Sequence, residues 1–266
     1  MSLILADLLS QVKKLYLDEL TSNDGKEPYL TAERICHDVL MIETDTLARI
    51  ITHDPSLLAA RAGDLVMNKQ ECENPSVGVI VCASLIAVAM DELLRIAVEK
   101  GWLEADEEQQ ILIDEDELVQ ETEYPITVDY SVSEYARQKL GQAGATVLSK
   151  LFQVAEKSFL ERLDNEIHDA YQLAMQVSSE YAVFAPEDLA PLVAENPLLL
   201  GLRPDGLIDD DLFEGDPPAG IIISSHLTHM LLEQLLELAA EQGALPKDSS
   251  GHLIMPEGEE DDPIVH

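Results

Sequence analysis

The sequence predicts a mainly α-helical protein with a small β element. Many segments place apolar side chains three and four positions apart, which is the spacing of one helix face. The uncharged run from Val77 to Met90 is too short to span a membrane and is typical of a buried core helix. Two stretches rich in β-branched residues and tyrosine, 109–120 and 123–132, supply the β element.

Four helices are expected in the first 100 residues. Ser2 can cap the first helix, and the polar segment 21–28 ends it near Leu20. Pro55 suits the first turn of a short third helix, because proline lacks the N–H that a helix leaves unpaired there. The four helices are expected over 2–20, over 31–52, from 55 onward and over 74–100.

The acidic residues of the β element alternate along the chain. In an extended strand Asp114 and Asp116 would point to one face, and Glu115 and Glu117 to the other. Neither face can then be buried, so the predicted strand pair should lie at an edge or protrude.

The C-terminal half is also predicted to be mainly helical. Ser131 and Glu134 form a capping box that begins a helical region, and Gly243 ends the last helix. The expected elements are helices over 131–181 and 186–196, a strand over 220–223, and a helix capped by Ser224 or Ser225.

These elements suggest four segments. Residues 1–100 form an N-terminal helical part, 101–130 the acidic β element, 131–246 a second helical part packed with the first, and 247–266 an acidic tail without fixed structure. No repeat with a period of 20 to 50 residues is visible, which argues against a solenoid.

Charge is the strongest functional signal. The chain has 52 acidic and 16 basic residues, a formal net charge of −36. Residues 163–266 hold 22 acids and two bases, whereas residues 1–100 hold 16 and nine, and this gradient favours a binding face over uniform adaptation to salt. Such a surface repels nucleic acids and anionic membranes and attracts basic proteins. We therefore expect a basic protein partner, no direct nucleic-acid binding and no membrane.

Motifs of common enzyme classes are missing from the sequence. It has no phosphate-binding loop, no dinucleotide fingerprint and no hydrolase elbow. The three cysteines, Cys36, Cys72 and Cys82, form no CxxC pair and no even set for disulfides. We expect a reduced, cytoplasmic protein without cofactor or metal.

Two polar clusters invite a metal-binding interpretation. In the acidic loop 209–214, Glu214 stands where an EF-hand needs its glycine. His226 and His229 lie three residues apart, with Glu233 four further on, but a metal site would need more ligands from another element. A solvated polar surface is the preferred interpretation of both clusters.

One pattern resembles an enzyme family. His-Asp pairs begin at His37, His53 and His168. The first lies on a predicted helix and resembles the metal-binding pair of HD-superfamily phosphohydrolases, which are helical. The resemblance implies a metal-dependent phosphohydrolase with His37 and Asp38 as ligands. The second pair precedes Pro55 and is typical of a helix end.

The last predicted helix carries a row of like charges. Glu233, Glu237 and Glu241 recur every four residues on one helix face, and no lysine interrupts them. Each like-charge pair costs a few tenths of a kcal/mol, which a merely solvated face usually avoids by alternating signs. The predicted partner-binding residues are these three glutamates and two further acidic groups, Asp209, Asp210 and Asp211, and Asp114, Glu115, Asp116 and Glu117.

The favoured hypothesis is a non-enzymatic inhibitor that imitates nucleic acid. Duplex DNA carries one charge per roughly 1.7 Å, so 36 carboxylates correspond to about 60 Å of duplex. Such a protein would occupy the basic cleft of a nuclease, a restriction or defence complex or a DNA-binding regulator, and would suit a phage or mobile element. Two alternatives stay open: a structural or assembly subunit that forms homo-oligomers, and the HD-like phosphohydrolase.

Overall fold

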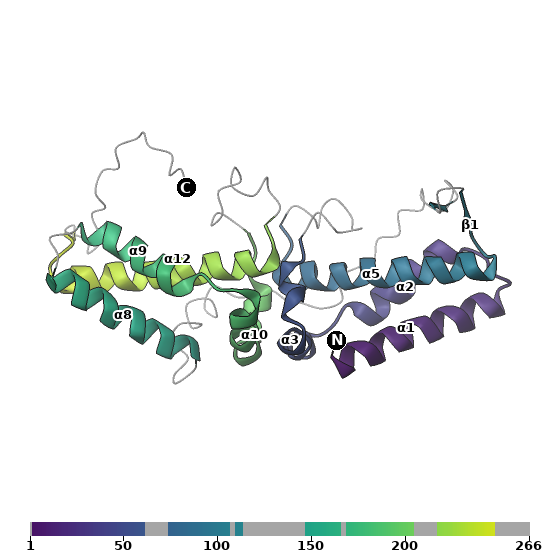
Figure 1. Cartoon of the computed structure of the whole chain (residues 1–266), viewed down its shortest axis with the longest axis horizontal. Helices are drawn as coiled ribbons and strands as arrows, with labels where there is room; N and C mark the ends of the chain where they lie inside the picture. The colour runs from purple at the N-terminus through teal and green to yellow at the C-terminus, as the bar shows by residue number, and fades with distance from the viewer. Residues whose placement is uncertain are drawn as a thin grey trace. The chain divides into compact units, whose positions relative to one another are not determined.

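The protein is mainly α-helical with one small sheet, as the sequence predicts (Figure 1). The computed structural model describes residues 2–61, 74–106, 110–113, 147–165, 169–204 and 217–247. The described elements are eight α-helices, two 3-10 helices (η1, η3) and two strands: α1 (Leu3–Ser22), α2 (Pro28–Leu40), α3 (Thr44–His53), η1 (Pro55–Ala59), α5 (Val77–Lys100), β1 (Glu104–Ala105), β2 (Ile111–Leu112), α8 (Val147–Asn165), α9 (Ala170–Ala182), α10 (Pro186–Glu195), η3 (Pro197–Gly201) and α12 (Ala219–Glu241).

The chain divides into two compact units, and the boundary between them falls within α12. The first unit comprises Met1–Leu140 and Phe184–Ile223, and the second comprises Gly141–Val183 and Ser224–His266. In the first unit α2 packs on α1 and α5, and α3 packs on α10. In the second unit α8 packs on α9. Each unit therefore combines segments that are far apart in the sequence.

α5 is the core helix of the first unit. Its first seven residues, 77–83, are buried on every side, as their uncharged sequence predicts. Among the described residues α5 is the one helix long and apolar enough to cross a membrane. However, 72% of its most apolar 18-residue window is buried inside the protein, which is the position of a core helix.

The helix expected over 31–52 is in fact two helices. The break lies at 41–43, where Glu43 is extended. Met41 and Ile42 are buried in the break, and the Ile42 N–H donates to Cys82 Sγ at 3.5 Å. The break thus buries two large apolar side chains and lets α3 pack on α10 while α2 packs on α5.

The helix expected to reach Tyr181 is interrupted. A new helix, α9, begins after Asp169, whose carboxylate accepts a hydrogen bond from the Tyr171 N–H at 2.9 Å. Aspartate is a strong N-cap residue, and this cap was overlooked because the apolar pattern continues across it. The predicted start of this helical region, 131–146, lies outside the described residues.

The strand predicted at 220–223 is wrong, since these residues form the first turn of α12. Ile222 and Ile223 are completely buried there, and their burial outweighs the strand preference of isoleucine. Ser224 and Ser225 therefore lie inside the helix and do not cap it. The predicted end at Gly243 is confirmed, because α12 stops two residues before this glycine.

The small sheet lies only partly where it is expected. β2 falls within the first predicted stretch, but it pairs in antiparallel fashion with β1, with Glu104 opposite Leu112 and Ala105 opposite Ile111. The second predicted stretch, 123–132, lies outside the described residues, as does the predicted tail from 248 onward. The described sheet thus pairs β2 with residues 104–105, which directly follow α5 and were not predicted as a strand.

The helices recur in the same order and with nearly the same lengths. α1, α2, α3, η1 and α5 have 20, 13, 10, 5 and 24 residues, and α8, α9, α10, η3 and α12 have 19, 13, 10, 5 and 23. We call these series the first repeat and the second repeat. From α2 onward each element of the second repeat begins 142 residues after its counterpart, as Pro28 and Ala170 show.

Sequence and burial follow the same correspondence. Residues 28–106 and 170–248 align without a gap, and 20 of the 79 pairs are identical. All four buried residues of α3 have buried counterparts in α10, and six of the seven in α2 have buried counterparts in α9. Both long helices are followed by a glycine at φ +74°, Gly101 and Gly243. The chain is therefore built from two copies of one helical arrangement.

Gly25 gives a test of the turn between α1 and α2. It has φ +72°, and a Cβ built there would lie 2.2 Å from Trp102 Cδ1. We expect Gly25→Ala to lower the free energy of unfolding by several kcal/mol, because the left-handed backbone and the collision both oppose it. Gly101→Ala is the control: it has φ +74° but open space, and should cost only about 1 kcal/mol. Urea unfolding followed by the fluorescence of Trp102, the single tryptophan, measures both. Equal losses would contradict the predicted collision.

Candidate partner-binding surface

The predicted row of glutamates lies on the exposed face of α12. Glu233, Glu237 and Glu241 are all exposed, and the helical rise sets neighbours about 6 Å apart along the axis. The opposite face is buried, with Leu231 and Leu235 completely covered. The 23 residues of α12 include no lysine or arginine. The helix therefore presents three carboxylates on a line, held by a packed apolar face.

One histidine of α12 contacts the row. His229 Nε2 lies 3.3 Å from Glu233 Oε1, and both side chains are more than half exposed. This contact is an ion pair only when the imidazole is protonated. Within the described part of the chain, Glu237 and Glu241 make no ion pair. Most of the negative charge of the row is therefore directed to solvent.

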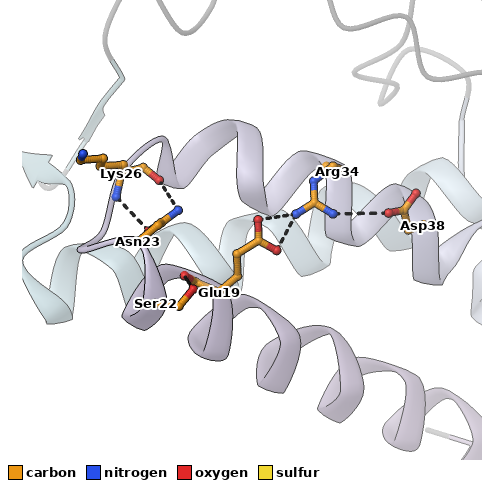
Figure 2. Close-up of polar contacts among 6 residues, drawn as sticks. All are labelled: Glu19, Ser22, Asn23, Lys26, Arg34 and Asp38. Carbon is orange, nitrogen blue, oxygen red and sulfur yellow. Dashed lines mark hydrogen bonds and ion pairs between the residues drawn. The ribbon is translucent and has the colours of Figure 1, made fainter.

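Several acidic side chains on other helices have basic neighbours. Both carboxylate oxygens of Glu19 on α1 accept hydrogen bonds of 2.6 Å from Arg34 on α2, and Arg34 Nη1 lies 3.6 Å from Asp38 (Figure 2). In the second unit Arg162 donates to both carboxylate oxygens of Glu180, and this hydrogen bonding lowers the pKa of Glu180. Such pairs neutralise the charge locally, and the row on α12 lacks them.

The first repeat has the same helix face with a different charge pattern. Asp91, Arg95 and Glu99 on α5 occupy the positions of the three glutamates on α12. Arg95 Nη2 lies 3.3 Å from Asp91 Oδ2, so the central position of this face is basic and paired with an acid. The fold accepts alternating signs at these positions. The uninterrupted row on α12 is therefore not a requirement of helix packing.

The other predicted partner-binding residues cannot be placed. Asp209, Asp210 and Asp211, and likewise Asp114, Glu115, Asp116 and Glu117, lie outside the described residues. The described ranges contain 26 acidic and 13 basic residues, so they carry −13 of the net charge of −36. Most of the excess charge thus belongs to the remaining segments, and among the described residues the row on α12 is the clearest concentration of it.

The two residues of the first His-Asp pair, His37 and Asp38, differ in their exposure to solvent. His37 is 7% exposed, whereas the Asp38 side chain is 63% exposed and contacts Arg34. Burial lowers the pKa of His37, and Asp38 opposes this shift only in part. Burial also raises the pKa of the neighbouring Cys36 thiol to about 12, which makes it a poor nucleophile. The two residues of the pair therefore do not converge on one site.

The remaining histidine patterns have structural explanations. His226 is buried and His229 is exposed, so they do not face one ligand. Asp54 follows the last turn of α3, and its Oδ1 accepts a 2.6 Å hydrogen bond from Ser56, as expected for a helix end. His168 lies outside the described residues. Over the ranges described, no three or more His, Cys, Asp or Glu side chains form a group that could hold a metal ion.

No family model, curated protein or solved structure matches this chain. Sequence reasoning found the row on α12 but overlooked its counterpart on α5. The signal was available as the constant spacing of 142 residues between the two helices.

The buried His37 predicts how stability depends on pH. Its pKa is lowered in the folded state, so as pH falls below about 6.5 the unfolded chain takes up the proton first. The stability contributed by the neutral side chain is therefore present above pH 6.5 and is lost as pH falls towards the folded pKa. We expect His37→Gln to flatten the decline in unfolding free energy between pH 7 and pH 5.5, measured by urea titration. His53→Gln, at an exposed histidine, should not flatten it, and equal effects would contradict the assignment.

Proposed function

We propose that this protein is a non-enzymatic acidic interaction protein whose α12 face binds a basic surface of another protein. The observation that carries the proposal is the contrast between two equivalent helices: α5 alternates acid and base where α12 has three glutamates. Like charges on one face lower helix stability by a few tenths of a kcal/mol per pair. A basic partner would offset this cost through electrostatic complementarity.

We further propose that the basic surface is a nucleic-acid-binding cleft. Along α12 one carboxylate recurs about every 6 Å, whereas one DNA strand carries a charge about every 3.4 Å. The row alone therefore reaches about half the linear charge density of one strand. An imitation of nucleic acid needs further carboxylates, and the other predicted partner-binding residues, 114–117 and 209–211, are the candidates for them. Blocking such a cleft would make the protein an inhibitor of a nuclease, a restriction or defence complex or a DNA-binding regulator.

An affinity pull-down tests the class of partner. The protein is immobilised and exposed to a lysate of the host cell. Mass spectrometry of the bound fraction should recover basic nucleic-acid-binding proteins that elute with salt, because exposed charge pairs are screened above about 0.15 M. Recovery of only this chain itself would contradict the proposal and favour the alternative of an assembly subunit.

A triple substitution tests whether the row is the binding face. Glu233→Gln, Glu237→Gln and Glu241→Gln together retain size and helix propensity but remove three charges. The control is Glu43→Gln, Glu99→Gln and Glu104→Gln, three exposed glutamates of the first unit. We expect the first variant to weaken partner binding at least ten-fold and to reduce its salt dependence, with unchanged unfolding free energy. Equal losses in both variants, measured by titration calorimetry, would show that only total charge matters.

A single substitution gives a sharper comparison. Glu237→Arg places a base at the centre of the row, which is the pattern that α5 already has at Arg95. Glu99→Arg makes the same change in net charge on the exposed face of α5. We expect only Glu237→Arg to weaken binding, because it alone interrupts three like charges. If Glu99→Arg weakens binding as much, the α12 face is not the contact surface.

A further inference from the structure

We propose that this chain is a fused dimer: two copies of one helical module that pair through reciprocal contacts inside a single polypeptide. The first repeat (3–100) and the second repeat (147–241) would then stand to each other as the subunits of a two-fold homodimer. The proposal does not depend on the partner proposed above. It follows from the equivalent contacts within the repeats and from the reciprocal contacts between them.

The same pair of positions links the first and last helix of each repeat. Lys13 on α1 lies 3.3 Å from Glu92 on α5. α1 and α8 align at an offset of 143 residues, which matches the buried Leu5, Val12 and Tyr16 with the buried Leu148, Ala155 and Phe159. At the positions that correspond to Lys13 and Glu92, Glu156 on α8 accepts a hydrogen bond from Gln234 on α12. The chemistry differs, because an ion pair in one repeat is an amide–carboxylate hydrogen bond in the other. The shared location shows that the two modules have the same helix arrangement.

A second shared contact links the first two helices of each repeat. In the first repeat Glu19 on α1 bonds to Arg34 on α2, which also contacts Asp38. In the second repeat Arg162 occupies the position of Glu19 and bonds to Glu180, which occupies the position of Asp38. The acid and the base have changed places between the helices, and the partner on the second helix lies one turn further on, at the position of Asp38 instead of Arg34. Both modules thus link their first two helices at the same position of the first helix, through different residues.

The repeats exchange contacts at the starts of their long helices. The Val77 N–H, at the start of α5, donates to the Leu202 carbonyl oxygen of the second repeat at 2.9 Å. The Ala219 N–H, at the start of α12, donates to the Ala60 carbonyl oxygen of the first repeat, also at 2.9 Å. Val77 corresponds to Ala219, and Ala60 to Leu202, so the two bonds are one interaction made in both directions. This reciprocity is the signature of an isologous interface.

Packing around these bonds is reciprocal as well. α3 of the first repeat packs on α10 of the second, η1 packs on α10, and η3 packs on α3, all within the first unit (Figure 1). The buried residues of α3 and α10 occupy the same four positions: Leu47, Ala48, Ile50 and Ile51, and Leu189, Ala190, Leu192 and Val193. Much of what covers each short helix thus comes from the other repeat. One module alone would expose this apolar surface and the first N–H of its long helix.

Cleavage of the full chain between the repeats tests the fused dimer. A protease site inserted between Leu140 and Gly141 cuts the folded protein at the boundary of the two units without removing any residue. The two halves should stay together in equal amounts on size-exclusion chromatography, and the melting temperature of the cut protein should rise with its concentration. Halves that separate, or that lose their helical circular dichroism on cleavage, would overturn the proposal.

Proline substitutions test the reciprocal bonds in the cut protein. Val77 and Ala219 are the first residues of their helices, where proline is tolerated, so Val77→Pro and Ala219→Pro remove mainly the exchanged donor. Each should weaken association of the halves by a similar factor, about five-fold. Thr44→Pro is the control, because the corresponding residue of α10 is already Pro186, and it should leave association unchanged. Opposite or strongly unequal effects of the two test substitutions, or an equal effect of the control, would overturn the reciprocal interface.

Discussion

The structure depends on covering the starts of two long helices, 77–83 of α5 and 219–223 of α12, which carry only apolar residues and glycine. A helix of this kind must be surrounded on every side, and two neighbours within one small module cannot do so. In the first unit the start of α12 is approached so closely that a Cβ on Gly220 would lie 3.3 Å from the Leu58 carbonyl oxygen. The corresponding residue of α5, Gly78, is also a glycine. The need to cover both helix starts explains why segments of the second repeat belong to the first unit.

Charge plays little part in holding this core together. Exposed ion pairs such as Lys13 with Glu92, or Asp91 with Arg95, contribute about 0 to 1 kcal/mol each, whereas burial of one large apolar side chain contributes about 1.5 to 3 kcal/mol. The basic residues are therefore better understood by what they do to the local field. Where a base lies beside an acid, the two charges largely cancel and the electrostatic field at the surface is weak. α12 has no lysine or arginine, so the field of its glutamates is not weakened in this way. The stability of the core therefore depends little on surface charge. Among the described helices, the exposed face of α12 is where unpaired negative charge is concentrated.

Much of the fold could be predicted from the sequence, and the failures share a cause. The helices that begin with a recognisable cap, α1 after Ser2 and α10 at Pro186, were predicted within two residues. The break at 41–43 and the helical start of α12 were not, because both are decided by burial against distant segments. Isoleucines 221–223 favour a strand locally, and only the packing of α12 makes them helical. Tertiary contacts of this kind cannot be read from a local pattern.

The candidate surface shows a related limit. The row of glutamates was visible in the sequence, since a spacing of four residues on a predicted helix places side chains on one face. Its significance was not visible, because total charge cannot separate a binding face from a soluble surface. The repeat supplies the missing comparison: α5 and α12 have the same length within one residue and end at equivalent glycines. The difference in charge between their exposed faces is therefore not imposed by helix length or by the way the helices end.

That comparison also limits what solubility can explain. If the acidic residues served only solubility, the exposed face of α5 should be as acidic as that of α12. However, α5 has Arg95 at the centre of this face. Divergence after duplication leaves each copy free to change wherever packing permits, and the exposed helix faces are such places. A face with three acids and no base is less favourable for the isolated helix, and the proposed contact with a basic partner would offset this cost. Under the proposed function, the α5 face keeps the pairing of Asp91 with Arg95, while the α12 face directs its three carboxylates to a partner.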